Sequence, residues 1–232
     1  MITYDLPQWM TIAFLIVIPI PFILIPLLAR QGAPSEKKNT VFLTVLLGLM
    51  AYFAYITVAQ QKGLFSAVGF PPKVLLYTTF PFAFLLFGVI LNLPIFKEIL
   101  GNVPLSNLVR VHIFRLIGVF FILIAWHDAL PKWFAFVAGL GDMITAITSI
   151  FVAKALSNKA HYAKKLTFIW NTFGTIDILF TAITANVLTK ISINTGAQGV
   201  DALAQYPFCI IPAFAPPVIL FLHYCIYKKL RA

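Results

Sequence analysis

Charged residues are scarce in this chain: they make up 10% of its 232 residues, and only seven residues are acidic. A typical soluble domain carries ~25% charged residues. With 61% hydrophobic residues and a mean hydropathy of +0.94, the chain has too few polar side chains to cover the surface of a soluble monomer. The composition also excludes a disordered chain and a collagen. A polytopic membrane protein is the class that remains.

Cysteine is also rare, and several motifs of catalytic and metal sites are missing. Cys209 and Cys225, the two cysteines, fall on one predicted helix. They are ~24 Å apart at 1.5 Å per residue, which is beyond the reach of a disulfide. The chain contains no HExxH, GxSxG, Walker or CxxC motif, and no cysteine–histidine spacing typical of zinc. We therefore expect neither an enzymatic activity nor a metal site.

Long apolar stretches are what the sequence has in abundance. A helix needs about 20 predominantly apolar residues to cross a bilayer, and seven stretches qualify. We predict an all-α bundle of seven transmembrane helices that forms a single domain, residues 1–232. The predicted spans are Trp9–Leu28, Thr40–Ala59, Val74–Leu93, Leu108–Ala125, Trp133–Ala155, Leu166–Leu188 and Pro207–Tyr227.

Lysine and arginine are unevenly divided between the two sides of this predicted bundle. Twelve lie in or beside the first, third and fifth connections and the C-terminal tail, whereas four lie on the other side. The positive-inside rule then places the C-terminus in the cytoplasm and the N-terminus outside. Because the basic residues are spread over several loops, the net charge of +10 fits the headgroups of a lipid bilayer and not a nucleic acid.

Ionisable side chains lie at depth only in the last four predicted helices, between the midplane and the inner surface. A charge at mid-bilayer costs at least ~2.5–3.5 kcal/mol, so each must face the bundle interior or water and find a partner. We therefore expect Arg115 to contact Asp142 or Asp177. The candidate site consists of His112, Arg115, Asp142, Asn171, Asp177 and His223.

The charges of this cluster do not balance. One arginine faces two aspartates, which gives a net charge of −1 in a low dielectric if both carboxylates are ionised. A protonated Asp, a cationic His or a bound cation would restore the balance. We therefore expect a site that binds or transports a small solute or a proton. Arg115 would hold an anionic group or an ionised Asp, and one Asp would accept the proton or cation.

Two other interpretations fit the same residues. In the first, the protein is a non-catalytic structural or assembly subunit of the membrane, and Arg115 only bridges helices. In the second, it is a haem- or quinone-linked protein, with His112 and His223 as axial ligands of a haem. Apart from this haem, no cofactor is expected.

Small residues and prolines mark two further helix faces. Gly139 shares a stripe with Asp142, and small residues at this spacing let another helix approach closely. Pro216 and Pro217 remove two backbone donors inside the seventh predicted helix, which leaves nearby carbonyls without a helical partner.

The last four predicted helices also carry several distinctive short segments. They are Arg115-Leu-Ile-Gly118, Leu130-Pro131, Phe134-Ala135, Ala138-Gly-Leu-Gly-Asp142, and the closing Pro207, Ile211-Pro212, Phe214, Pro216, Pro217 and His223. In these segments the chain resembles a family of bacterial seven-helix integral membrane proteins of undetermined function. The resemblance implies a multi-pass protein of the bacterial cytoplasmic (inner) membrane, and it brings no activity with it.

Overall fold

The computed structural model of the chain describes residues 4–65 and 69–231, and all regular structure within these ranges is helical. Seven helices in these ranges are long and apolar enough to cross a membrane, and each overlaps one predicted span. The all-α class with seven candidate spans is therefore confirmed. Spans one to seven are Gln8–Gly32, Ser35–Gln61, Leu75–Asn92, Leu105–Trp126, Lys132–Ser157, Ala163–Thr195 and Ile210–Arg231.

Several spans are built from more than one helical element. Spans two, five, six and seven contain the long helices α3 (Lys38–Gln61), α8 (Lys132–Ser157), α9 (Ala163–Thr195) and α10 (Ile210–Arg231). Span one consists of α1 (Gln8–Val17) and α2 (Pro19–Gly32), and span three has α4 (Phe80–Phe84) between the π-helical turns Leu75–Thr79 and Leu85–Val89. The helix α5 (Pro94–Asn102) follows, and span four comprises α6 (Leu105–Arg110), a 3-10 segment (Val111–Gly118) and α7 (Val119–Trp126). Shorter 3-10 turns lie at Ser35–Lys37, Ile90–Asn92 and Asp201–Ala204.

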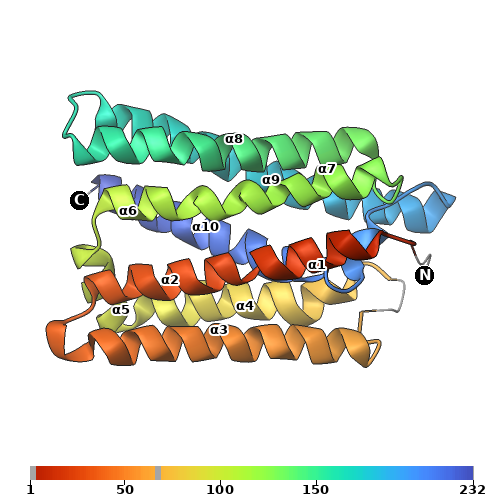
Figure 1. Ribbon diagram of the computed structural model, residues 1–232, viewed down its shortest axis with the longest axis horizontal. Coiled ribbons are helices and arrows are strands. Elements are labelled where there is room, and N and C mark those ends of the chain that lie inside the picture. Colours follow the sequence, from red (N-terminus) through yellow and green to blue (C-terminus); the bar gives the residue numbers. More distant parts are fainter. Residues whose placement is uncertain (1–3, 66–68, 232) are drawn as a thin grey trace.

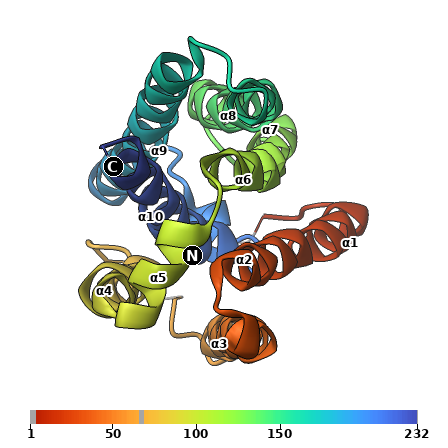
Figure 2. The same ribbon diagram turned by 90° about the vertical axis from the view of Figure 1, so that its left-hand side faces the viewer.

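The spans run roughly along one long axis (Figure 1). Seen end-on, α10 lies near the centre, with α6 to α9 on one side of it and α2 to α5 on the other (Figure 2). α10 accordingly packs against α9, α6, α4 and α3. This central position lets α10 join the polar residues of the last four spans to the apolar first three.

Several helix limits differ from the predicted ones, and one span is divided. α9 continues to Thr195 instead of ending at Leu188, because its last turns carry exposed polar residues that hydropathy does not count as part of a span. It ends at Gly196, whose φ of +72° forms a left-handed cap. Span one is divided at Ile18, directly before Pro19, which has no N–H for a helical bond. α10 begins at Ile210, three residues after Pro207.

The prolines of α10 leave two carbonyls free, as predicted, and hydroxyl groups of other spans bind both of them. Pro216 and Pro217 have no N–H for the carbonyls of Pro212 and Ala213, four residues earlier. Thr79 Oγ1 donates to the Pro212 oxygen at 2.7 Å, and the Tyr52 hydroxyl donates to the Ala213 oxygen at 2.9 Å.

In span three, too, a side-chain hydroxyl binds a carbonyl that lacks a backbone N–H because of a proline. Pro81 has no N–H for the Tyr77 carbonyl, which accepts a hydrogen bond from the Tyr55 hydroxyl at 3.0 Å. Spans two and three are thus held to each other and to α10 by polar bonds at proline-freed carbonyls. Such bonds satisfy backbone groups that water does not reach in a bilayer.

Candidate functional site

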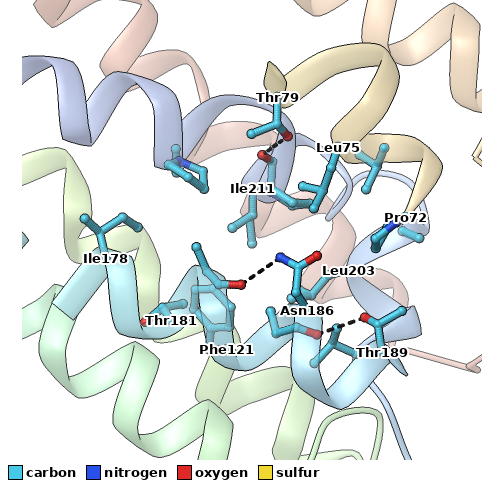
Figure 3. A pocket seen from close by; sticks show the side chains of 18 of the residues that line it. Pro72, Leu75, Thr79, Phe121, Ile178, Thr181, Asn186, Thr189, Leu203 and Ile211 are labelled. Carbon is cyan, nitrogen blue, oxygen red and sulfur yellow. Dashed lines mark hydrogen bonds between the residues drawn. The ribbon is translucent and has the colours of Figure 1, made fainter. Parts of the chain in front are cut away.

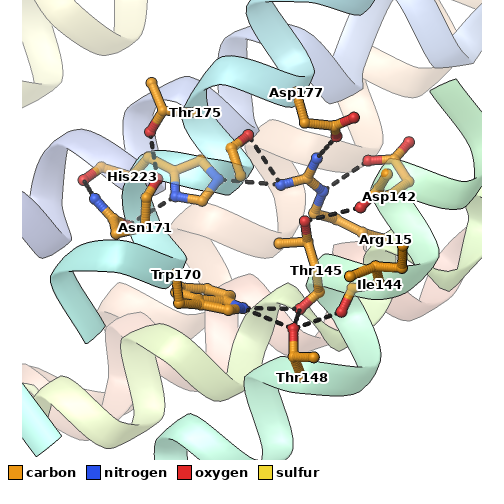
Figure 4. A network of polar contacts seen from close by, with 12 residues as sticks. Arg115, Asp142, Ile144, Thr145, Thr148, Trp170, Asn171, Thr175, Asp177 and His223 are labelled. Carbon is orange, nitrogen blue, oxygen red and sulfur yellow. Dashed lines mark hydrogen bonds and ion pairs between the residues drawn. The ribbon is translucent and has the colours of Figure 1, made fainter. Parts of the chain in front are cut away.

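Arg115 lies at the centre of the predicted cluster and is completely buried. Its Nε donates to Asp142 Oδ1 at 2.6 Å, and its Nη2 donates to Asp177 Oδ2 at 2.5 Å. Nη1 donates to the Gly174 carbonyl at 3.3 Å and lies 3.0 Å from His223 Nε2 (Figure 4). The expected contact between Arg115 and one aspartate is therefore confirmed, and the arginine pairs with both.

The 3-10 winding of span four sets the direction of the Arg115 side chain. Residues three apart eclipse each other in a 3-10 helix, so His112, Arg115 and Gly118 lie on one face of the segment. This face is turned toward α8: a Cβ atom at Gly118 would come within 3.1 Å of Asp142 Oδ2 and of the Gly139 carbonyl oxygen. The close approach at Gly118 and Gly139 confirms that the small-residue stripe of α8 packs against another helix.

The protonation of His223 follows from its two partners. A guanidinium has no acceptor atom and stays protonated, so His223 Nε2 must accept the hydrogen bond from Arg115. His223 Nδ1 then carries the proton and donates to Asn171 Oδ1 at 2.8 Å. Asn171 Nδ2 in turn donates to the His223 carbonyl at 3.1 Å. His223 is thus a neutral hydrogen-bond link between α9 and the arginine.

His112 is the one predicted site residue without a polar contact in the described part of the chain. Its side chain is fully buried, and neither ring nitrogen has a hydrogen-bond partner there. Its ring centroid lies 4.4 Å from that of His223 and 5.2 Å from that of Trp170. The Trp170 indole is held by α8, donating to Thr145 O at 3.2 Å and Thr148 Oγ1 at 3.1 Å.

The arrangement of these histidines does not fit a haem. An axial ligand must offer a free ring nitrogen to the iron. Both nitrogens of His223 already have partners in Arg115 and Asn171, and its ring packs directly against that of His112. In this arrangement His223 therefore has no ring nitrogen free for an iron, and its hydrogen bonds could not be read from the sequence.

The two carboxylates are not fully used by Arg115. Each gives one oxygen to the guanidinium, and the second oxygen of each accepts no hydrogen bond from the described residues. Both side chains retain 8% exposure. With His223 neutral, the group formed by Arg115, Asp142 and Asp177 carries a net charge of −1 when both carboxylates are ionised.

A cavity of about 180 Å³ leads to this cluster. It lies between α9, α10, the start of span three and the turn Asp201–Ala204, and Asp142 forms part of its wall. Figure 3 shows Phe121, Thr181 and Asn186 directed toward the same space. The pKa of Tyr4 is raised above its ordinary value, mainly by the partial burial of Tyr4 and to a smaller extent by the charge of Asp201.

Tight packing fixes the cluster where two glycines of α8 and α9 lie against it. A Cβ atom at Gly141 would overlap a carboxylate oxygen of Asp177, and one at Gly174 would lie 2.7 Å from His223 Cε1 and 3.0 Å from Arg115 Nη1. Such distances are shorter than side-chain packing permits. The two glycines therefore let α8 and α9 approach the charged groups with their backbones.

The structure brings the six predicted residues together, and it adds residues that the sequence did not single out. The Gly174 carbonyl accepts from Arg115, and Asn186, Thr189 and Asp201 line the cavity. Asn186 and Thr189 lie five and eight residues after Thr181 on α9, and these polar residues were visible in the sequence. No comparable signal marks Asp201, which lies outside every predicted span.

A family model described as a domain of unknown function (DUF8737) matches residues 71–231. No curated protein and no solved structure matches the chain. The matched residues contain spans three to seven, and with them the whole charged cluster and each described residue that lines the cavity. Because this match extends over more than half of the sequence, the chain belongs to the DUF8737 family.

Proposed function

We propose that this protein binds a small solute or a proton at the Arg115–Asp142–Asp177 cluster, and moves it across a membrane. One observation carries the proposal: a cavity reaches Asp142 in a buried cluster whose carboxylates each keep an oxygen without a donor among the described residues. Buried charges that serve only to join helices have no need of such access. Intramembrane ionisable residues that face a cavity are typical of solute and proton pathways.

Each residue of the cluster has a different role in this proposal. Arg115 holds one oxygen of Asp142 and of Asp177 in place through charged hydrogen bonds. One of the two aspartates accepts the proton or cation with its second oxygen. His223 and Asn171 fix the far side of the guanidinium, and His112 packs behind them.

The proposal includes a location and an orientation. The protein is a multi-pass protein of the bacterial inner membrane, with the N-terminus outside and the C-terminus in the cytoplasm. Support comes from the seven apolar helices and from the uneven distribution of lysine and arginine between the two ends of the bundle.

A structural or assembly role is the second candidate, and one observation favours it. All three guanidinium nitrogens of Arg115 already bind acceptors within the protein. The arginine therefore joins spans four, five and six whether or not a solute binds.

Infrared spectroscopy of the protein in lipid, titrated with pH, distinguishes the two candidates. A binding role predicts that Asp142 or Asp177 gains and loses a proton while the protein stays folded. The carboxylic-acid C=O band should then disappear as the pH rises, and it should be missing from Asp142→Asn or Asp177→Asn. Asp128→Asn is the matched control, since Asp128 is exposed and paired with Lys132. If neither aspartate titrates over the range in which the protein is folded, the structural role is correct.

A further inference from the structure

The charges around the cavity all have one sign. Its lining includes the carboxylates of Asp142 and Asp201, and within the described residues no lysine, arginine or histidine lines it. The neighbouring Arg115 is not part of this lining, and four of its five N–H donors already bind acceptors within the protein. The cavity is therefore electrostatically suited to a cation.

Most of the wall is apolar, which excludes a strongly hydrated inorganic cation as the best occupant. Aromatic and aliphatic side chains line the space from five spans, among them Leu75, Phe121, Phe134, Ile178 and Ile211. The Phe121 and Phe134 rings meet edge to face, 6.0 Å apart. Such a wall gains free energy by covering an apolar body, and aromatic faces also attract organic cations.

The size of the cavity limits that body. Its volume of about 180 Å³ is a little more than that of an engineered apolar cavity of ~150 Å³ that holds benzene. A single ring with a short chain is therefore the upper limit.

We propose that this cavity binds a small apolar molecule with one protonated amine, its ammonium group on the free oxygen of Asp142 and its apolar body among the phenylalanine and aliphatic side chains. The inference rests on the proposed function and names the substrate class of the same site. A monovalent cation also neutralises the net charge of −1 that Arg115, Asp142 and Asp177 carry together.

Polar groups along α9 complete the recognition. Thr181 and Asn186 line the cavity. The Asn186 amide nitrogen donates to the Ala182 carbonyl, and its side-chain oxygen accepts no hydrogen bond from the described residues. An ammonium group has three donors, of which Asp142 uses only one. Oxygen acceptors on α9 thus offer further positions as the molecule passes from the Asp201 end toward Asp142.

Three probes of nearly the same shape test this assignment on the full chain in lipid nanodiscs. They are 2-phenylethylamine, the neutral 2-phenylethanol and the anion phenylacetate, with binding measured by calorimetry at neutral pH. We expect the amine to bind about tenfold or more tightly than the alcohol, as a charged hydrogen bond in a water-poor site implies. Phenylacetate should not bind.

Variants test whether Asp142 causes the preference for the amine over the alcohol. Asp142→Asn should reduce the affinity for the amine to that for the alcohol, whereas Asp128→Asn should leave both unchanged. Should Asp142→Asn fail to fold, Ala185→Leu gives an independent test, because Ala185 lines the cavity and is itself uncharged. The larger side chain fills the space, and binding of both amine and alcohol should be lost while the infrared titration of the carboxylates persists.

Three results would overturn the inference: equal affinity for amine and alcohol, preference for phenylacetate, or no binding of any probe. If one of these occurs while Asp142 or Asp177 still titrates in the infrared experiment, only the amine class is wrong and the proposed function stands. If neither aspartate titrates and no probe binds, both fail together.

Discussion

Spans one to three and spans four to seven are built on different principles. In span two, 11% of the most apolar stretch is buried within the protein, against 67% in spans four and seven. Among the described residues, the buried acidic and basic side chains other than histidine are Arg115 and Asp142 in spans four and five, and spans one to three contribute only Thr78 and Thr79 to the buried polar residues. The first region is held by apolar packing and a few hydroxyl groups at proline-freed carbonyls, and the second by a charged network. The most apolar stretch of span six, which carries Asn171 and Asp177, is 22% buried, as in span three. The close packing around the cluster therefore comes mainly from spans four, five and seven.

Arg115→Leu should have the largest effect, because it leaves the carboxylates of Asp142 and Asp177 buried without their shared partner. Removing one member of a buried ion pair costs roughly 3–5 kcal/mol. The free energy of unfolding in detergent measures this loss. Arg110→Leu, at an exposed arginine of the same span, should change it by less than about 0.5 kcal/mol.

Restoring the charge balance tests whether the loss comes from the stranded carboxylates. Adding Asp142→Asn and Asp177→Asn to Arg115→Leu should recover much of the stability. If the triple variant is no more stable than Arg115→Leu, packing and not charge determines the effect.

Glycine substitutions in the two regions should have opposite signs. A Cβ atom at Gly139 would lie 2.8 Å from the Gly118 carbonyl oxygen, whereas nothing lies within 4 Å of one at Gly48 in α3. Gly139→Leu should destabilise the bundle by about 1–3 kcal/mol through overpacking. Gly48→Leu should stabilise it by up to about 0.8 kcal/mol through helix propensity. Thermal melting of both variants provides the measurement, and equal melting temperatures would contradict the comparison.

Smaller losses are expected where spans two and three meet α10. Tyr52→Phe and Thr79→Val each remove the hydroxyl donor to a carbonyl that a proline has freed. Each should cost about 0.5–1.5 kcal/mol of unfolding free energy. Tyr77→Phe is a suitable control, since the Tyr77 hydroxyl makes no hydrogen bond to the described residues. A control loss as large as that of Tyr52→Phe would show that the aromatic substitution itself is harmful.

A C-terminal reporter should leave the stability unchanged and report the orientation of both regions. Alkaline phosphatase fused after Ala232 should be inactive, because it requires export, and a cytoplasmic fluorescent protein at the same position should be active. The twelve-to-four division of basic residues is the basis. An active phosphatase fusion would reverse the proposed orientation of the cavity.

The sequence predicted the seven candidate spans because apolar length alone identifies them. It also predicted the members of the cluster, because an ionisable residue in a bilayer must have a partner. It did not predict that Arg115 pairs with both aspartates, since Asp142 and Asp177 are equivalent in depth and charge. The isolation of His112 and the wall of the cavity depend on ring orientations and on the turn Asp201–Ala204, which hydropathy does not describe.

The 3-10 segment was also absent from the prediction, because Val111–Gly118 reads as an ordinary apolar stretch. Its consequence is mechanical. As an α-helix, the 22 residues of Leu105–Trp126 would measure about 33 Å at 1.5 Å per residue. Eight residues at about 2.0 Å each lengthen this span to about 37 Å. The winding that aligns His112 with Arg115 therefore also lengthens span four by about 4 Å without adding a residue.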